Sequence, residues 1–393
     1  MTIDAASQRS PVAPHIYDGY QVHRAALAYG LTVLALPRQV LLAGRKSAVP
    51  AAISFTHGVP EASTMSAVTY AQDRRLRRAL LERVGLPVPR GATFTWRSID
   101  RAAQWVAREP GYPVVVKETV GENPAKTILD VSSDDELMAA FQVLRRRRPE
   151  DRSPGRNRDL AGYAANRLGF QIDDDGNEVA PPRTRFLIER QLRGVYVRIF
   201  ACGDETPVSV VMDPRTGEPV RDVSAQLDAS FSTVALRAVR GVPGLAAATV
   251  DIILEDPTSP ADTQEHHIVE LAERPRAASY ATADESLGDR IGDTLVRFQA
   301  GQANLVLPPQ RKAITTDIRV EGLRDAAAVA AGFTTAASGY DVDGAVAVTD
   351  DLEGIVAGTC HGTPAAIAAL NESLMNGDLL GDRSSCIESR VEA

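Results

Sequence analysis

The sequence predicts an α+β protein, and three observations indicate this class. In the middle of the chain, runs of β-forming residues and helix-like stretches are mixed, as in two α+β subdomains. The last segment reads as strand, helix, two strands, helix and strand, which is the order of the ferredoxin-like fold. The first segment mixes helix-like and strand-like stretches, as a small α/β domain does. A chain of 393 residues has room for roughly two to three such domains.

Residues 1–65 form the predicted α/β lead-in domain. Tyr20–Tyr29 is helix-like, and Leu31–Leu36 and Ala51–Phe55 are strand-like, with glycine and proline between them. Residues 66–310 follow as the central domain. It begins with a helical stretch over Ser66–Val84, which Gly85 and two prolines end.

Later in the central domain, the sequence predicts a helix over Asp134–Leu144, with Ser132 and Ser133 supplying its N-cap. Residues 145–182 read as a flexible insertion, because a block of arginines, a block of aspartates and a Pro-Gly pair interrupt any period. The insertion is either a solvated loop or an arm that grips an acidic substrate.

Residues 311–393 form the predicted ferredoxin-like domain. Its strands and helices, in chain order, are expected at Ile314–Val320, Leu323–Ala337, Gly344–Thr349, Ile355–Thr359, Pro364–Leu374 and Ser384–Val391.

Composition and charge exclude some partners. The chain is 44% hydrophobic and 24% charged, as globular proteins are, and its formal charge of −8 argues against a DNA or RNA partner. Its cysteines, Cys202, Cys360 and Cys386, match no zinc or disulfide spacing and suggest a reducing compartment.

No apolar run approaches about 18 residues, and the first ten residues lack a signal-peptide pattern. We expect a cytoplasmic protein with no membrane partner.

Four strand-like runs each deliver one ionisable residue, in the order Lys117, Glu189, Asp251 and Glu270. One cation and three carboxylates are what a Mg-ATP cleft needs, since ammonium binds phosphate oxygens and carboxylates bind Mg²⁺. A hairpin over the Pro257–Glu265 loop would bring Asp251 beside Glu270, where two carboxylates repel unless a cation lies between them. The alternatives are a lysine that reaches solvent from its strand end, and acids that are solvated or paired with a local arginine.

The order and spacing of these runs resemble the ATP-grasp ligases. The phrase from Asp73-Arg74 to Gly85-Leu86-Pro87 is similar to the cyanophycin synthetase and glutathione synthetase type, which usually has lysine at the position of Arg74. The resemblance implies two α+β subdomains clasping ATP. It assigns nucleotide contacts to Arg74 and Lys117, and to the hinge residues Glu189, Arg190, Gln191 and Leu192.

The same resemblance implies further roles and shows departures. Arg198 would contact a phosphate or the acyl phosphate, and Arg215 would stabilise the acyl phosphate unless it lies in a surface turn. Tyr196 stands where a ribose-binding acid is common. Lys126, in a glycine-poor loop, would add charge over the phosphates. The family's metal-binding asparagine is replaced by Ala272, so Glu273 or water would complete the Mg²⁺ site with Asp251 and Glu270.

The last domain resembles the acylphosphatases, but Ala330 and Val348 stand near their arginine and asparagine positions. We therefore expect no phosphatase activity there, and a role in packing, homodimer formation or substrate cover. Together these resemblances imply an ATP- and Mg²⁺-dependent ligase that forms an amide or peptide bond on small-molecule or peptide substrates. The alternative is a catalytically impaired, nucleotide-binding regulatory or scaffold subunit.

Overall fold

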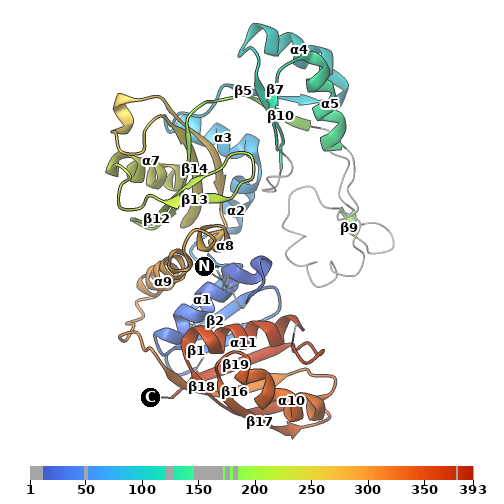
Figure 1. The fold of residues 1–393 in the computed structure, drawn as a ribbon, viewed down its shortest axis with the longest axis vertical. Helices are drawn as coiled ribbons and strands as arrows, with labels where there is room; N and C mark the ends of the chain where they lie inside the picture. The colour runs from blue at the N-terminus through green and yellow to red at the C-terminus, as the bar shows by residue number, and fades with distance from the viewer. Residues whose placement is uncertain are drawn as a thin grey trace, which may run out of the picture. The chain divides into compact units, whose positions relative to one another are not determined.

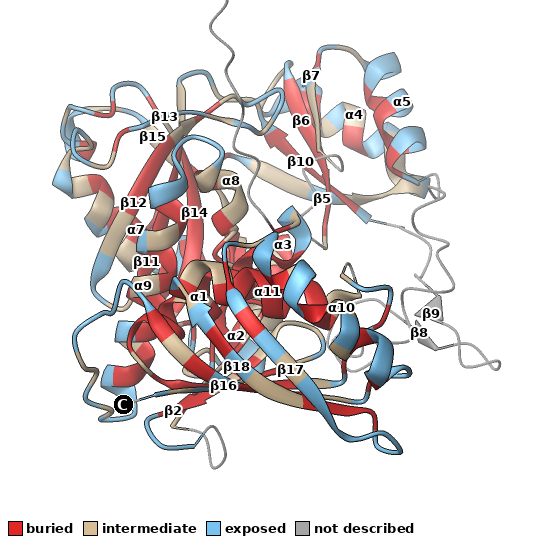
Figure 2. Cartoon of the chain, turned by 60° about the horizontal axis from the view of Figure 1, so that its bottom comes forward, coloured by how far each residue is buried: buried red, intermediate tan, exposed pale blue. Residues whose placement is uncertain are grey.

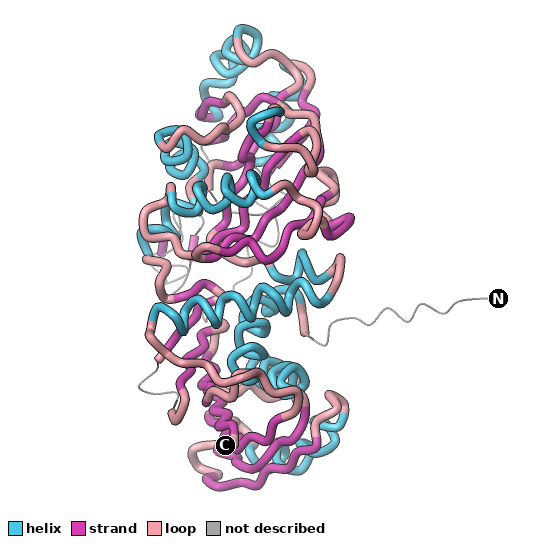
Figure 3. Tube along the Cα trace, turned by 90° about the vertical axis from the view of Figure 1, so that its left-hand side faces the viewer, coloured by secondary structure: helices cyan, strands magenta, loops and turns pink. Residues whose placement is uncertain are grey.

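The computed structural model describes residues 12–47, 52–120, 127–145, 171–172, 178–179, 185–377 and 379–392. Helices and strands are mixed throughout (Figure 3), and the sheets are antiparallel, which confirms the predicted α+β class. The chain divides into two compact units. Unit 1 comprises residues 1–61, 276–281 and 285–393, and unit 2 comprises residues 62–275 and 282–284. Within the described residues, no helix has the length and apolar character needed to cross a membrane.

Unit 1 is built on an eight-stranded sheet in the order β17-β18-β16-β19-β1-β2-β3-β4. Helices α1, α9 and α11 pack together beside it (Figure 1). Its elements are η1 (Pro14–Ile16), α1 (Tyr17–Ala28), β1 (Thr32–Leu36), β2 (Val40–Gly44), β3 (Ile53–Thr56), β4 (Val59–Pro60), α8 (Ala277–Ala281), α9 (Glu285–Gln302), β16 (Ile314–Glu321), α10 (Ala326–Ser338), β17 (Asp343–Asp350), β18 (Ile355–Gly362), α11 (Pro364–Asn376) and β19 (Cys386–Val391).

The last segment has the predicted strand and helix order, and its sheet order β17-β18-β16-β19 is that of a ferredoxin-like fold. It is not separate from the lead-in segment, however, because β19 pairs with β1 and joins the two into one sheet. Helix α9, which the sequence places in the central domain, also belongs to this unit. Tyr29, the residue after α1, donates to Asp293 of α9 at 2.6 Å, and Arg24 of α1 binds Asp289 of α9 at 3.0 Å.

Unit 2 contains two larger sheets, in the orders β5-β10-β6-β7 and β13-β12-β11-β14-β15. Its elements are α2 (Met65–Gln72), α3 (Arg74–Arg83), β5 (Gly91–Thr95), η2 (Trp96–Ser98), α4 (Ile99–Arg108), β6 (Val114–Glu118), β7 (Thr127–Val131), α5 (Asp134–Arg145), β8 (Gln171–Ile172), β9 (Glu178–Val179), β10 (Arg185–Arg190), β11 (Val195–Cys202), β12 (Glu205–Met212), β13 (Pro219–Asp222), α7 (Ala229–Arg240), β14 (Ala247–Leu254), η6 (Ala261–Thr263) and β15 (His266–Ala272).

Each larger sheet has one face covered by helices (Figure 1). Helices α4 and α5 cover the four-stranded sheet, where Val114, Val116 and Ile188 join their core. Helix α7 packs against the five-stranded sheet, where Val250 and Leu271 are buried. The central strands of both sheets are buried (Figure 2). Because side chains alternate across a strand, the residues between these apolar positions point to the opposite face.

The helical stretch predicted over residues 66–84 is two helices, not one. Asp73 has an extended backbone, with φ −94° and ψ 108°, and it ends α2 and begins α3. Its carboxylate accepts a hydrogen bond from the backbone N–H of Arg75 at 2.8 Å, which caps α3. The break gives α3 its own direction. Most of the predicted insertion over residues 145–182 lies outside the described residues.

Candidate functional site

Lys117 and Glu189 form an ion pair on the face of the four-stranded sheet opposite helices α4 and α5. Val115 is the cross-strand partner of Glu189, and Leu187 is that of Lys117, so all four side chains share one face. The ammonium Nζ of Lys117 lies 2.8 Å from Oε2 of Glu189 and donates to the Val269 carbonyl at 3.2 Å. Both side chains are buried. Lys117 therefore does not snorkel to solvent but is held inside unit 2.

Arg198, Asp251 and Glu270 form a row across the five-stranded sheet. Asp251 of β14 is the register partner of Arg198 on β11 and of Glu270 on β15. The predicted hairpin and the predicted proximity of Asp251 to Glu270 are thus confirmed. A register shift next to this pair leaves Val269 as an extra residue in β15, and its carbonyl is the one that accepts from Lys117.

Both oxygens of the Asp251 carboxylate accept hydrogen bonds. Arg198 approaches it with two parallel bonds, Nε to Oδ1 at 2.8 Å and Nη2 to Oδ2 at 2.9 Å. The Tyr196 hydroxyl donates to Oδ2 at 2.6 Å. Asp251 is 0% exposed, and burial raises the pKa of Tyr196, which keeps its hydroxyl protonated as a donor. This fork-to-fork geometry is the strong form of an arginine–carboxylate pair.

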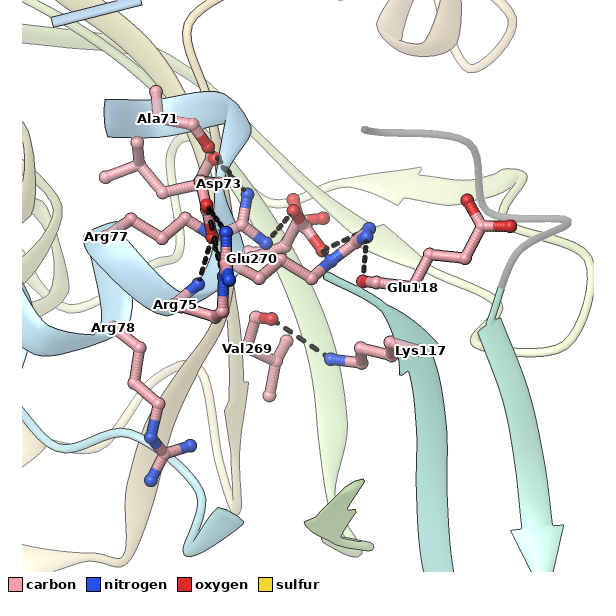
Figure 4. Close-up of polar contacts among 12 residues, drawn as sticks. Ala71, Asp73, Arg75, Arg77, Arg78, Lys117, Glu118, Val269 and Glu270 are labelled. Carbon is pink, nitrogen blue, oxygen red and sulfur yellow. Dashed lines mark hydrogen bonds and ion pairs between the residues drawn. The ribbon is translucent and has the colours of Figure 1, made fainter. Parts of the chain in front are cut away.

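Helix α3 supplies the arginines that pair with Glu270 and Glu189. Arg74 donates from Nε and Nη2 to Oε2 of Glu270 at 3.3 and 3.2 Å, and Arg77 forms an ion pair with Oε1. Arg78 binds Glu189 at 3.0 Å. Figure 4 shows Arg77 beside Glu270 and Lys117 directed at Val269, while the Glu118 carboxylate points away from Glu270. The term arginine–carboxylate cluster is used below for Arg74, Arg77, Arg78, Lys117, Glu189, Arg198, Asp251 and Glu270.

Backbone carbonyls fix the two buried arginines in place. Arg74 donates to the Glu118 carbonyl at 2.7 Å, and Arg77 donates to the carbonyls of Leu271 at 2.7 Å and Ala71 at 3.1 Å. Burial lowers the pKa of Arg77, and the charge of Glu270 opposes that effect. The guanidinium groups are therefore rigid parts of the site rather than mobile surface charges.

A magnesium ion does not fit this donor set as it stands. Both oxygens of Asp251 and both oxygens of Glu270 already carry a guanidinium partner. Glu273, proposed from the sequence as a replacement ligand, accepts from the Gln72 amide at 2.8 Å and is 1% exposed. In the described part of the chain, no group of three or more histidine, cysteine, aspartate or glutamate side chains is arranged to hold a metal ion.

The predicted hinge is the segment that joins the two larger sheets. Arg190 ends β10, and residues Gln191 to Gly194 lead into β11. Gly194, just before β11, has φ 146°, and a Cβ atom there would collide with the Leu254 carbonyl. The backbone N–H of Arg190 donates to Arg90 and that of Gln191 to Pro113. Residues of the hinge, Arg190 to Arg193, line a cavity of about 510 Å³ together with Tyr112, Asp130, Ile253 and His267.

Two predicted residues lie elsewhere. Arg215 is in an exposed turn between β12 and β13, where its backbone N–H donates to the Asp213 carboxylate at 2.8 Å. None of the contacts that join the described cluster involves it, so the surface-turn alternative describes its position. Lys126 lies outside the described residues.

Sequence reasoning missed Arg77 and Arg78. Their signal was present in the spacing Arg74, Arg77, Arg78, because positions three and four residues apart share one face of a helix. The role of Tyr196 was also missed: its hydroxyl supports Asp251.

No protein-family model matches the chain, and no curated protein matches it. The chain is similar to a solved structure of a D-alanine–D-alanine ligase from Bacillus anthracis, with 13% identity over 62% of this chain and 71% of that one and a TM-score of 0.40. A RimK domain protein ATP-grasp from Sphaerobacter thermophilus has 18% identity over 59% of this chain and 69% of that one, with a TM-score of 0.35. A bifunctional glutathione synthetase from Pasteurella multocida has 13% identity over 67% of this chain and 41% of that one, with a TM-score of 0.40. The chain thus spans less than half of the synthetase. At such low scores these likenesses carry no weight for function, which rests on the residues of the site.

Proposed function

We propose that the chain is an ATP-dependent ligase of the ATP-grasp kind that joins a carboxylate to an amine. One observation carries the proposal: a hinge between the two sheets lines a cavity, and in the same unit Lys117, Arg74, Arg77 and Arg198 are held as buried cations by strands of both sheets and by α3. A nucleobase at the hinge would be read by carbonyl oxygens and the Leu192 N–H, since the N–H groups of Arg190 and Gln191 are already used. The cations of the cluster would face the phosphates.

The proposed reaction has two steps. A carboxylate oxygen of the substrate attacks the γ-phosphorus of ATP, the bond to the β-phosphate oxygen breaks, and ADP leaves. The amine nitrogen then attacks the carbonyl carbon of the acyl phosphate, phosphate leaves with the C–O bond electrons, and the amine loses a proton to give an amide. Lys117 and Arg198 would offset negative charge that develops during transfer, and no protein nucleophile is required.

A second candidate function is a nucleotide-binding regulatory or scaffold subunit without turnover. The observation that favours it is the occupation of Asp251 and Glu270 by arginines, together with Ala272 in place of an oxygen ligand. The substrates would be amino acids or peptides in the first case, and there would be none in the second.

One experiment separates the candidates. The protein is incubated with ATP, with and without Mg²⁺, and with pooled amino acids and dipeptides. ADP release and product masses are measured, and nucleotide binding is measured by calorimetry. The buried Lys117 is changed in Lys117→Met, and the exposed Lys312 serves as the matched control in Lys312→Met. Substrate-dependent ADP release that only Lys117→Met abolishes supports the ligase. Nucleotide binding without such release supports the second candidate, and the lack of nucleotide binding contradicts both.

A further inference from the structure

The two carboxylates that the sequence assigns to magnesium are balanced by the protein itself. Three guanidinium groups, from Arg74, Arg77 and Arg198, pair with the carboxylates of Asp251 and Glu270. All five groups lie in unit 2 and are largely shielded from water, with side-chain exposures between 1% and 12%. In such surroundings charges interact more strongly than in water.

Magnesium would have to displace these arginines. The ion needs about six oxygen ligands at roughly 2.1 Å in octahedral geometry. At Asp251, Oδ2 already accepts two donors, from Arg198 and Tyr196. At Glu270, Oε2 already accepts two bonds from Arg74. An oxygen with two lone pairs that accepts two donors has none left for a metal. The other two oxygens, Oδ1 of Asp251 and Oε1 of Glu270, each lie against a guanidinium group, whose charge repels a divalent cation.

Moving the arginines away from the carboxylates would also destabilise the fold. Arg77 would lose the carbonyls of Leu271 and Ala71 as well as Glu270, and Arg74 would lose the Glu118 carbonyl. A buried charge that loses its partner is strongly destabilising, because it stays out of water without compensation. The helix that carries both arginines is anchored at its start by Asp73. The cluster is therefore preorganised in its metal-free arrangement.

We propose that this site binds the phosphates of a nucleoside triphosphate without a divalent cation, the guanidinium groups of Arg74, Arg77 and Arg198 taking the place of Mg²⁺. The inference rests on the proposed nucleotide binding. A divalent ion normally cancels the repulsion between phosphates and acidic residues. Here Asp251 and Glu270 are already neutralised, and Lys117 is paired with Glu189, so the third guanidinium leaves one net positive charge for the nucleotide.

The test is calorimetry of the whole chain with the non-hydrolysable analogue AMP-PNP, once with excess EDTA and once with excess Mg²⁺. For the native sequence we expect dissociation constants that agree within about threefold, a difference below 1 kcal/mol. Binding that appears only with Mg²⁺, or that is at least about tenfold tighter with it, overturns this inference and leaves the proposed function intact. The absence of binding in both buffers overturns the proposed function and this inference with it.

A variant pair adds a second readout. Arg77→Gln leaves Glu270 with Arg74 alone and removes the excess guanidinium charge, so binding in EDTA should weaken about tenfold, and Mg²⁺ should restore part of it. Arg83→Gln changes an exposed arginine of the same helix and should alter neither value. If Arg77→Gln weakens AMP-PNP binding equally in EDTA and in Mg²⁺, the guanidinium groups do not take the place of the metal, and the inference is contradicted. If Arg77→Gln does not fold, the measurement on the native sequence still decides.

Discussion

Glu270→Gln distinguishes an ion-pair role from a metal-ligand role, because the two predict opposite results. The glutamate carboxylate binds Arg74 and Arg77, whose side chains are 3% and 5% exposed. Glutamine keeps the shape and one acceptor oxygen but removes the charge. If the carboxylate serves to balance the arginines, the substitution destabilises the fold. If it serves a magnesium ion, the substitution mainly lowers turnover and alters the dependence on magnesium.

The magnitude follows from the contacts. Removal of one partner of a buried ion pair costs about 3–5 kcal/mol, and we expect the lower end, about 3 kcal/mol, because Arg77 keeps two carbonyl acceptors and Arg74 keeps one. For a unit of this size, that corresponds to a fall of roughly 6–12 °C in the melting temperature of unit 2.

Urea unfolding and thermal unfolding measure this change. Glu218→Gln, in the exposed turn before β13, is the control and should stay within about 0.5 kcal/mol of the native chain. The double variant Arg77→Gln with Glu270→Gln should be more stable than the sum of the single losses predicts, by about 1–3 kcal/mol. A Glu270→Gln protein with native stability and a changed magnesium dependence would refute the ion-pair reasoning.

Three further outcomes are expected. Burial lowers the pKa of His267, so the unfolded chain takes up its proton first as pH falls; stability should drop as the pH falls below about 6.5, and less so in His267→Gln, as denaturation at several pH values would show. Burial, with Glu321 and Glu388, raises the pKa of Cys386 to about 11, so iodoacetamide should label it slowly at about pH 8 in the native protein and rapidly in urea; fast native labelling would contradict this. The whole chain should release no phosphate from acetyl phosphate, since Ala330 and Val348 supply neither a charge nor an amide; sustained release would place those groups elsewhere.

Local pattern predicted much of the fold. The strands that deliver Lys117, Glu189, Asp251 and Glu270 are all present, because a run of β-forming residues between turn residues predicts a strand from local pattern. The hairpin of β14 and β15 was predictable as well, since a short loop joins neighbouring strands. The break at Asp73 had a signal in the sequence, because aspartate favours the N-cap position over a helix interior.

The pairing of strands that lie far apart along the chain could not be predicted from the sequence. The register Val33 to Ser389 joins strands from opposite ends of the chain, and no local period encodes such a pairing. The interactions of the arginines were hidden for the same reason. Which carboxylate Arg74 or Arg198 binds depends on the register of β11, β14 and β15 and on the direction of α3. The residue types alone were equally compatible with phosphate contacts and with internal ion pairs.

That Mg²⁺ does not fit the donor set of the described cluster does not by itself decide between a ligase and a binding protein. Charge that develops in phosphoryl transfer can be stabilised by any cation held in place before the reaction, and it is the fixed position that makes such groups effective. Arg198 is locked by two bonds to Asp251, and Arg77 by two backbone carbonyls. The question is therefore whether these guanidinium groups favour the transition state over bound ATP. Arg198→Lys answers it: a fall in the rate of ADP formation with unchanged AMP-PNP affinity would assign Arg198 to the transferring phosphoryl group, whereas equal losses in both would assign it to binding alone.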